Sequence, residues 1–251
     1  MIEKNKLALT LSGGAARGAF HLGILAFLED KAITIDAYSG SSIGAIIACS
    51  HASGIEARKQ LEIFQSKEIK KVLKFNYFKK GLIRIDKEHP ILDTLLPIRK
   101  LEELPKPVTV NAYDTRTKKI LYFDKGDSHQ LCMASSALIP LFKPIHYEGH
   151  NLIDGGLFDN MPIKPLEHKE YKIYTVDLMP KIQRQTKQRF SPLRPLKKRL
   201  FKTRTDNIHY SIAHSDVYIT HTHLPHINMY TFKGLQESFD LGFKEASKYF
   251  S

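Results

Sequence analysis

Two stretches of the chain decide its fold: KLALTLSGGAARGAFHLGILAFLED at residues 6–30 and ITIDAYSGSSIGAIIACSHAS at residues 33–53. In each, a short apolar run predicts a buried strand, a glycine-containing turn follows, and helically spaced apolar residues predict a helix. We expect strands at residues 6–11 and 33–38, the second stopping at Ser39 and Gly40, and helices at residues 17–30 and 45–53. This repeated order is typical of an α/β fold with a mainly parallel central sheet flanked by helices.

The rest of the chain continues the alternation less regularly and contains no internal repeat. Its apolar patterns predict strands at residues 108–113, 119–123, 151–153, 171–178 and 216–222. Helical patterns cover residues 56–78, 128–138 and 234–250. Because no clear domain boundary interrupts these elements, we interpret residues 1–251 as one domain.

The composition is that of an ordinary globular domain, with 42% of the 251 residues apolar and 25% charged. No apolar run reaches the roughly 18 residues that suggest a membrane-spanning helix. The first residues, MIEKNKLALTLSGG, lack the long apolar segment of a secretory signal peptide. The two cysteines, Cys49 and Cys132, lie in apolar surroundings and are expected to be buried free thiols. We therefore expect a cytoplasmic protein.

A candidate nucleophile lies in the second glycine turn, where Gly40 to Gly44 match the pattern G-x-S-x-G around Ser42. A serine at a sharp strand-to-helix turn exposes its hydroxyl, and glycines on both sides allow close backbone packing. The spacing selects Ser42 over Ser41. We interpret Ser39 and Ser41 as turn or helix-capping residues.

The first glycine turn, Ser12 to Gly18, includes Gly13, Gly14, Ala15 and Arg17. Small residues at the start of a helix leave backbone N–H groups free to bind an anion. A nucleotide phosphate loop is disfavoured, because Ala15 stands where the dinucleotide fingerprint needs glycine and no P-loop lysine follows. An oxyanion hole is favoured by the nucleophile turn on the next strand. Arg17 is expected to brace this loop or to meet an anionic head group.

A candidate base follows the strand at residues 151–153, where Asp154 precedes Gly155 and Gly156. A serine hydroxyl needs a base to accept its proton, and Asp154 could act directly or through a histidine. The alternative is an aspartate that only forms an Asx-turn. Asp159 is similar but lacks the preceding strand and the following glycines.

Taken together, these motifs resemble the patatin-like phospholipase family. The resemblance runs from Leu7 to about Pro165, with a similar end at residues 234–250. It rests on the glycine loop with its arginine, the G-x-S-x-G turn, and Asp-Gly-Gly followed by Asn160-Met161-Pro162. The segment at residues 134–140, ASSALIP, is similar to a segment that lines the site in that family.

The resemblance implies a three-layer α/β/α fold and a lipid acyl hydrolase without cofactor or metal. It implies a Ser–Asp dyad in which Ser42 attacks the ester of a fatty acyl lipid and Asp154 takes the proton. The backbone N–H groups of Gly14 and Ala15 would stabilise the oxyanion. The family often has glycine at the position of Ala15, but alanine also supplies an N–H group, so we expect the hole to persist.

Histidines leave a variant of this mechanism open. Several of them follow Asp154 in the chain, as the chain order Ser, Asp, His of many hydrolases requires, among them His209, His214, His221 and His223. The spacing of His221 and His223 could suggest a metal pair, but no third ligand has convincing spacing. We interpret these histidines as surface or core residues.

The formal net charge of +12 suits an anionic partner, and ten lysines or arginines without an acid lie between Lys181 and Arg204. This basic segment could be a solvated loop or could contact anionic membrane. Nucleic acid is not expected, because no nucleic-acid-binding motif is present. Two further hypotheses remain: an acyltransferase with the same dyad, and a basic binding protein whose catalytic residues are relics. Sequence does not indicate the oligomeric state.

Overall fold

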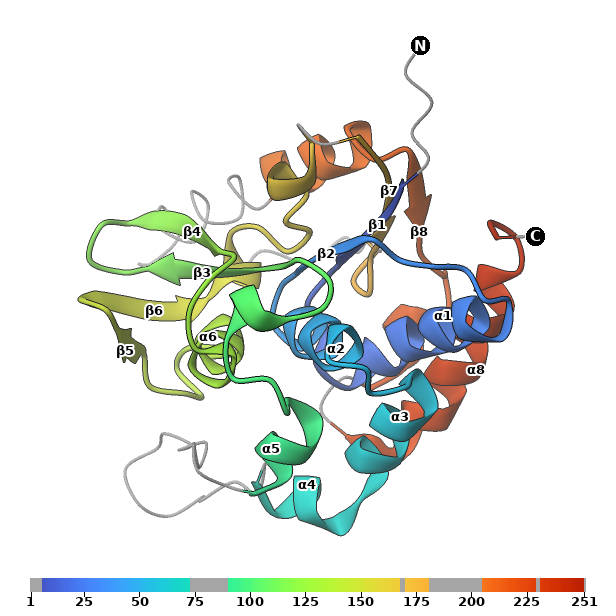
Figure 1. The fold of residues 1–251 in the computed structure, drawn as a ribbon, viewed down its shortest axis with the longest axis horizontal. Helices are drawn as coiled ribbons and strands as arrows, with labels where there is room; N and C mark the ends of the chain where they lie inside the picture. Colours follow the sequence, from blue (N-terminus) through green and yellow to red (C-terminus); the bar gives the residue numbers. More distant parts are fainter. Residues whose placement is uncertain (1–5, 73–89, 168–169, 181–204, 229–230, 251) are drawn as a thin grey trace, which may run out of the picture.

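The computed structural model describes residues 6–72, 90–167, 170–180, 205–228 and 231–250. The basic segment of residues 181–204 lies outside these described residues. Helices cover a central sheet, and the ends of the described chain lie toward one side of the molecule (Figure 1). None of the described helices is long and apolar enough to cross a bilayer.

The sheet has eight strands, in the order β5-β6-β3-β2-β1-β7-β8, with β4 paired to β3. Its centre is parallel from β3 to β8, whereas β4, β5 and β6 pair antiparallel at one end. The predicted α/β class is confirmed, and the sheet is mixed. The strand bounds are β1 Lys6–Leu11, β2 Ala37–Gly40, β3 Val108–Asp114, β4 Lys119–Phe123, β5 Ile145–Tyr147, β6 His150–Asp154, β7 Tyr171–Val176 and β8 Val217–Ile219.

Strand β3 brings the ends of β2 and β6 together. Strand β4 occupies one edge of β3 from Val110 to Asp114, so β2 and β6 share its other edge. Parallel β2 ends opposite Val110 with Gly40, and antiparallel β6 ends opposite Ala112 with Asp154. The carboxyl ends of two strands that run in opposite directions therefore meet two residues apart along β3.

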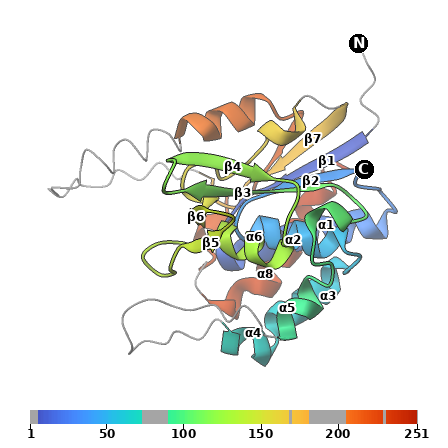
Figure 2. The same ribbon diagram turned by 60° about the vertical axis from the view of Figure 1, so that its left-hand side comes forward.

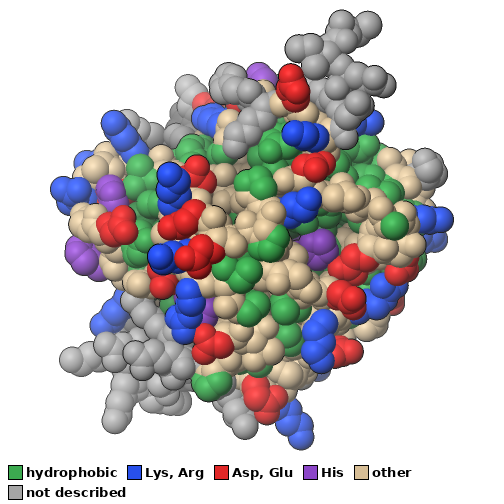
Figure 3. Space-filling model, viewed as in Figure 1, with side chains coloured by type: hydrophobic (Ala, Val, Ile, Leu, Met, Phe, Trp, Pro, Cys, Tyr) green, Lys and Arg blue, Asp and Glu red, His purple; other side chains and the backbone are tan. Residues whose placement is uncertain are grey.

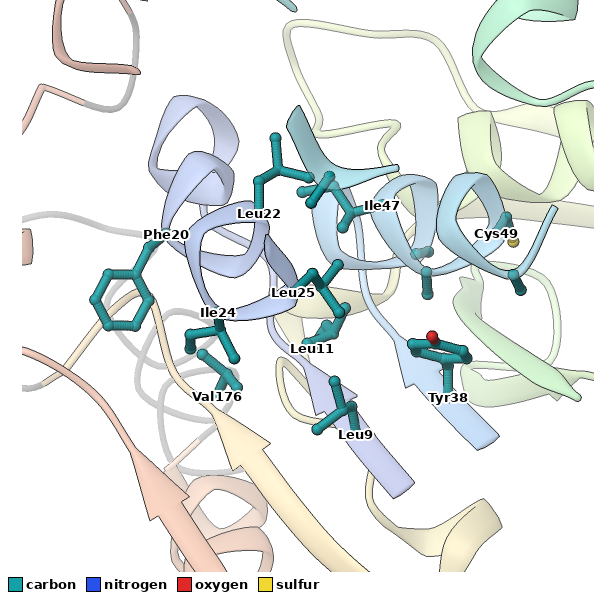
Figure 4. Close-up of a cluster of buried hydrophobic side chains, with 14 of the residues drawn as sticks. Leu9, Leu11, Phe20, Leu22, Ile24, Leu25, Tyr38, Ile47, Cys49 and Val176 are labelled. Carbon is teal, nitrogen blue, oxygen red and sulfur yellow. The ribbon is translucent and has the colours of Figure 1, made fainter. Parts of the chain in front are cut away.

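One face of the sheet carries the main hydrophobic core. Leu9 and Leu11 of β1 project toward the helices with Tyr38 and Val176 of the neighbouring strands (Figure 4). Leu25 of α1 and other apolar residues of α1 and α2 pack against them. The helices of this layer are α1 Ala19–Asp30, α2 Ile43–Ala52, α3 Ala57–Gln65, α4 Lys67–Val72, α5 Pro90–Leu95, α6 Ser128–Ser135 and α8 Leu235–Ala246.

The opposite face carries a smaller cluster, as the alternation of side chains along a strand requires. Ala8, Ala37 and Ile173 lie side by side on three strands and pack under Ile163 and Leu166. The helix at residues 205–213 covers this face, and α1, α2 and α8 lie on the other (Figure 2). Helices thus cover both faces of the sheet, and the helical layer on the face of the main core is the thicker of the two.

Several boundaries differ from the sequence-based expectations. Strand β2 begins at Ala37 instead of residue 33 and includes Ser39, which is therefore a strand residue and not a turn residue. The predicted helix at residues 56–78 is divided at Ser66, whose backbone is extended, and its last residues lie outside the described part. Cys49 and Cys132 are buried free thiols, as predicted, with 3.6 Å between their Sγ atoms.

Candidate active site

The turn around Ser42 is strained and tightly packed, as a nucleophile turn requires. Ser42 precedes α2 with φ 53° and ψ −124°, a conformation that costs a non-glycine residue about 1–2 kcal/mol. A Cβ atom on Gly44 would lie 2.2 Å from the carbonyl oxygen of Leu11, and one on Gly40 would lie 2.6 Å from the Cα atom of Ala45. Both glycines are therefore required by lack of space.

Helix α6 supports this turn from the side. The backbone N–H of Ser42 donates to Oγ of Ser135, the last residue of α6, at 2.8 Å. The N–H of Ser41 donates to the carbonyl oxygen of Leu11 at 3.1 Å. Ser135 is fully buried, so its hydroxyl satisfies a donor that water does not reach. Of the predicted site-lining segment, Ser135 thus contacts Ser42 directly.

The glycine loop lies beside the nucleophile turn. A Cβ atom on Gly13 would be 3.1 Å from Cβ of Ser42, and one on Gly18 would be 2.5 Å from a side-chain carbon of Ile43. Ala15, where the family often has glycine, adopts φ 50° and is exposed. Alanine therefore takes the left-handed conformation that glycine adopts without cost, at about 1–2 kcal/mol.

Two N–H groups of this loop are candidates for binding an anion. No described residue accepts a hydrogen bond from the backbone N–H of Gly14 or Ala15. Gly14 precedes and Ala15 begins the short helix η1 (Ala15–Gly18), whose first N–H groups have no partner within the helix. Such groups can stabilise a negative charge.

Arg17 braces the base of the loop. Its guanidinium donates to the carbonyl oxygens of Ile227 at 2.9 Å, Pro225 at 3.0 Å and Leu178 at 3.4 Å. Of the two roles that the sequence left open, these contacts correspond to bracing. The loop is thereby tied to residues 224–227, which are far from it in sequence.

Asp154 is the last residue of β6, whose carboxyl end meets that of β2 along β3. It is 8% exposed, and its Oδ1 accepts the N–H of Gly156 at 2.7 Å, so the Asx-turn that the sequence offered as an alternative is present. The N–H of Asp154 donates to the carbonyl oxygen of Ala137 at 3.1 Å. Gly155 lies against Asn111, where a Cβ atom would be 2.5 Å from the amide oxygen.

Asn160 lies close to both the glycine loop and the turn after Asp154. A Cβ atom added to Gly13 would lie 2.8 Å from Oδ1 of Asn160 and 3.1 Å from Cβ of Ser42. A Cβ atom added to Gly156 would lie 2.6 Å from the same Asn160 oxygen and 3.1 Å from Oδ1 of Asp154. Ser42 and Asp154 thus each lie against a glycine that touches the same buried amide. Sequence analysis named Asn160 only as part of a motif.

Polar residues near the site have structural partners. Asp159 accepts a hydrogen bond from the hydroxyl of Tyr122 at 2.6 Å, and burial raises the pKa of its carboxyl group. Buried His21 contacts the carbonyl oxygen of Ser12 through Nε2 at 2.9 Å, and burial lowers its pKa to about 4. Neutral His21 therefore donates to the strand end that carries the glycine loop.

The histidines considered as assistants to Asp154 make contacts elsewhere. His214 contacts the carbonyl oxygen of Tyr210, and His221 and His223 face Glu245 and Glu237 of α8. His209 lines a cavity with Asp177 and Tyr218. Within the described part of the chain, no group of three histidine, cysteine or acidic side chains could hold a metal ion.

Comparison with known proteins places these motifs in a family. Residues 9–167 match the family model of patatin-like phospholipases. The chain belongs to the patatin-like phospholipase family. The matched residues include the glycine loop, the turn at Ser42 and Asp154-Gly155-Gly156. The resemblance inferred from the sequence motifs is therefore confirmed.

Curated relatives of this patatin-like chain are longer than the chain itself. An uncharacterized NTE family protein of Mycobacterium tuberculosis is 31% identical over 166 residues, covering 64% of the chain and 45% of the relative. A protein named lysophospholipase NTE1 from Meyerozyma guilliermondii is 26% identical over 193 residues, covering 71% of the chain and 13% of the relative. The chain thus spans less than half the length of these relatives.

Solved structures support the patatin-like fold. VipD from Legionella pneumophila superposes with a TM-score of 0.61 at 16% identity, covering 97% of the chain and 66% of VipD. The type III effector ExoU gives a TM-score of 0.51 at 15% identity, covering 97% of the chain and 52% of that protein. At these identities the likeness concerns the fold.

Proposed function

We propose that the protein is a serine lipid acyl hydrolase in which Ser42 is the nucleophile and Asp154 the base. The observation that carries this proposal is the meeting of two strand ends along β3, one leading to Ser42 and the other ending at Asp154, with the glycine loop packed against Ser42. Family membership and relatives named lysophospholipase favour a fatty acyl ester as the substrate.

In the first half of the proposed reaction, Oγ of Ser42 attacks the acyl carbonyl carbon while Asp154 accepts the hydroxyl proton. The N–H groups of Gly14 and Ala15 stabilise the resulting oxyanion, and a donor of this kind is typically worth about 3 kcal/mol. Collapse of the tetrahedral intermediate breaks the ester bond, and Asp154 returns its proton to the departing alcohol. The acyl group then remains on Ser42.

In the second half, water attacks the acyl carbonyl and Asp154 takes one of its protons. The oxyanion forms in the same position, so the same two N–H groups act again. Collapse releases the fatty acid and returns the proton to Ser42. The N–H of Ser42 donates to Ser135 and is not needed for either step.

The strained turn at Ser42 also argues against relic catalytic residues. A conformation at φ 53° costs free energy, and the surrounding contacts of Ser135, Gly40 and Gly44 maintain it. A protein that served only as a binding module would gain stability from a relaxed turn. Retention of the strain favours an active nucleophile.

Covalent labelling with a fluorophosphonate tests the proposal directly. We expect an adduct on Ser42 in the native protein and none in the Ser42→Ala variant, whereas Ser41→Ala retains labelling. Asp154→Asn should retain the fold and lose ester turnover by about a thousandfold or more. An adduct-free native protein would contradict the proposal.

A second measurement separates the dyad from a triad. Four single variants are made, in which one histidine each is exchanged for alanine: His209, His214, His221 and His223. Turnover and the free energy of unfolding are measured for each variant, so that loss of activity is distinguished from loss of the fold. The dyad predicts that all four variants keep turnover within about threefold when folded. Loss of turnover in one folded variant would assign that histidine as the base. Product analysis with added glycerol detects acyl transfer.

A further inference from the structure

An apolar loop at residues 138–142, LIPLF, follows α6 and leads toward β5. Ile139 in this loop is 45% exposed, the highest value among the large apolar side chains of the described residues. Pro140 is also exposed, and Leu138, Leu141 and Phe142 are half-buried. Contact of apolar surface with water is unfavourable, so a partner that covered Ile139 would gain free energy from its burial.

The apolar loop is connected to both proposed catalytic residues. Ser135, three residues before it, accepts the N–H of Ser42 at 2.8 Å. Ala137, immediately before it, accepts the N–H of Asp154 at 3.1 Å. Hydrogen bonds from Leu138 to Ser136 and from Phe142 to Leu138, each 2.9 Å, fold it into a compact turn. The apolar loop therefore directly follows the residues that hydrogen-bond Ser42 and Asp154.

Charge around the apolar loop suits an anionic surface. Lys143 follows it and is exposed, and no aspartate or glutamate occurs from Ser128 to Tyr147. On the face seen in Figure 3, basic and acidic side chains are interspersed. An exposed isoleucine beside a lysine, without a neighbouring acid in the segment, is the pattern of side chains that enter a lipid surface.

We propose that the apolar loop at residues 138–142 inserts into the lipid surface that supplies the substrate. Ile139 enters the acyl region and Lys143 meets the head groups. This inference rests on the proposed function for the choice of lipid as the partner. Insertion would bring the acyl esters close to the segment that hydrogen-bonds Ser42 and Asp154 through Ser135 and Ala137.

The absence of tryptophan from the chain allows a direct test. Ile139→Trp introduces a single tryptophan in the apolar loop, in a Ser42→Ala background that leaves the vesicles intact. Tyr249→Trp is the matched control, because Tyr249 is 37% exposed and lies near the C-terminal end, across the molecule from α6 and β5. Vesicles of phosphatidylcholine with phosphatidylglycerol are added at low and high salt.

We expect the emission of Ile139→Trp to shift to shorter wavelength on vesicles and to be quenched by brominated acyl chains, at both salt concentrations. Tyr249→Trp should show neither effect. In the same Ser42→Ala background, Ile139→Ser should raise the lipid concentration for half-maximal binding about tenfold. These three results support insertion and do not require catalysis, so they remain distinguishable from fluorophosphonate labelling of Ser42.

Four outcomes would overturn the inference. One is vesicle binding without a shift at position 139, which would assign the contact to another surface such as residues 181–204, especially if salt abolishes it. Another is the absence of binding at low salt. Equal shifts at both tryptophans would indicate unspecific adsorption. A shift that depends on protein concentration without vesicles would assign the apolar loop to contact with a second copy of the chain.

Discussion

The side-chain amide of Asn160 donates a hydrogen bond to the carbonyl oxygen of Gly13 at 3.2 Å. In a trans peptide the carbonyl group and the following N–H group point in opposite directions. Holding the carbonyl oxygen of Gly13 on the Asn160 side therefore directs the N–H of Gly14 to the other side. We therefore infer that Asn160 orients the first proposed oxyanion donor.

Exchange of Asn160→Ala should release this peptide unit and lower kcat by about ten- to a hundredfold, because small misplacements of catalytic groups have effects of this size. KM should change less, since the amide does not contact the acyl chain. Steady-state kinetics on a short ester measures both. Asn207→Ala is the control, because Asn207 makes a comparable 2.9 Å hydrogen bond to the carbonyl oxygen of Phe158. Equal kcat in both variants would contradict the positioning role.

Ser135→Ala removes the acceptor for the N–H of Ser42. We expect the free energy of unfolding to fall by about 1–3 kcal/mol, because a buried donor loses its partner. Turnover should fall by roughly tenfold as the strained turn relaxes. Ser50→Ala serves as the comparison: Ser50 is fully buried in α2, and its hydroxyl has no partner among the described residues. Denaturant unfolding and ester kinetics of both variants check this, and a neutral Ser135→Ala variant would refute it.

Gly44→Ala should prevent the nucleophile turn from forming. Its Cβ atom would lie 2.2 Å from the carbonyl oxygen of Leu11, so β1 and α2 would have to separate. We expect destabilisation of about 3 kcal/mol or more, as for other severe core overpacking. Gly54 has φ 89°, and a Cβ atom added there would meet no atom within 4 Å. Gly54→Ala should therefore cost only about 1–2 kcal/mol of backbone strain. Comparable thermal unfolding of the two variants would argue against the steric explanation.

Protonation of His21 should destabilise the protein as the pH falls. Its pKa is lowered from 6.5 to about 4 by burial, so between these values the unfolded chain binds the proton and the folded chain does not. Stability therefore rises with pH in this window, by up to about 1.4 kcal/mol per pH unit from this residue. His21→Gln, whose amide can still donate to Ser12, should flatten the pH dependence between about 4.5 and 6.5. Chemical unfolding at several pH values measures it, and an unchanged slope would exclude His21 as the source.

The sequence predicted those parts of the site where the backbone itself imposes the residue type. Gly40 and Gly44 were predicted because a Cβ atom has no room there, and that requirement leaves a mark in the local sequence. Strand β1 was predicted with its observed bounds because its apolar run is short and ends at glycines. The division of the predicted helix at Ser66 was missed, since both halves keep helical composition.

Contacts between distant segments had no local signal. Ser135 and Asn160 are small polar residues whose roles arise from partners far along the chain, at Ser42 and Gly13. Arg17 was predicted to brace its own turn or to meet an anionic head group, and its contacts with the carbonyl groups at residues 225 and 227 had no signal in the sequence. The antiparallel pairing of β6 was likewise hidden, because a strand's direction depends on its partner and not on its own sequence.

The shared edge of β3 sets the spacing of the proposed catalytic pair. Two residues of β3 determine the spacing between the ends of β2 and β6. The length of the chain between Gly40 and Asp154 does not affect it. Helices and loops in the intervening chain could lengthen or shorten over evolution while this spacing stays constant. A single insertion between Val110 and Ala112, by contrast, would separate the pair and reverse the direction of one side chain. Insertions and deletions should therefore be tolerated in the segments around β3 and disfavoured between Val110 and Ala112.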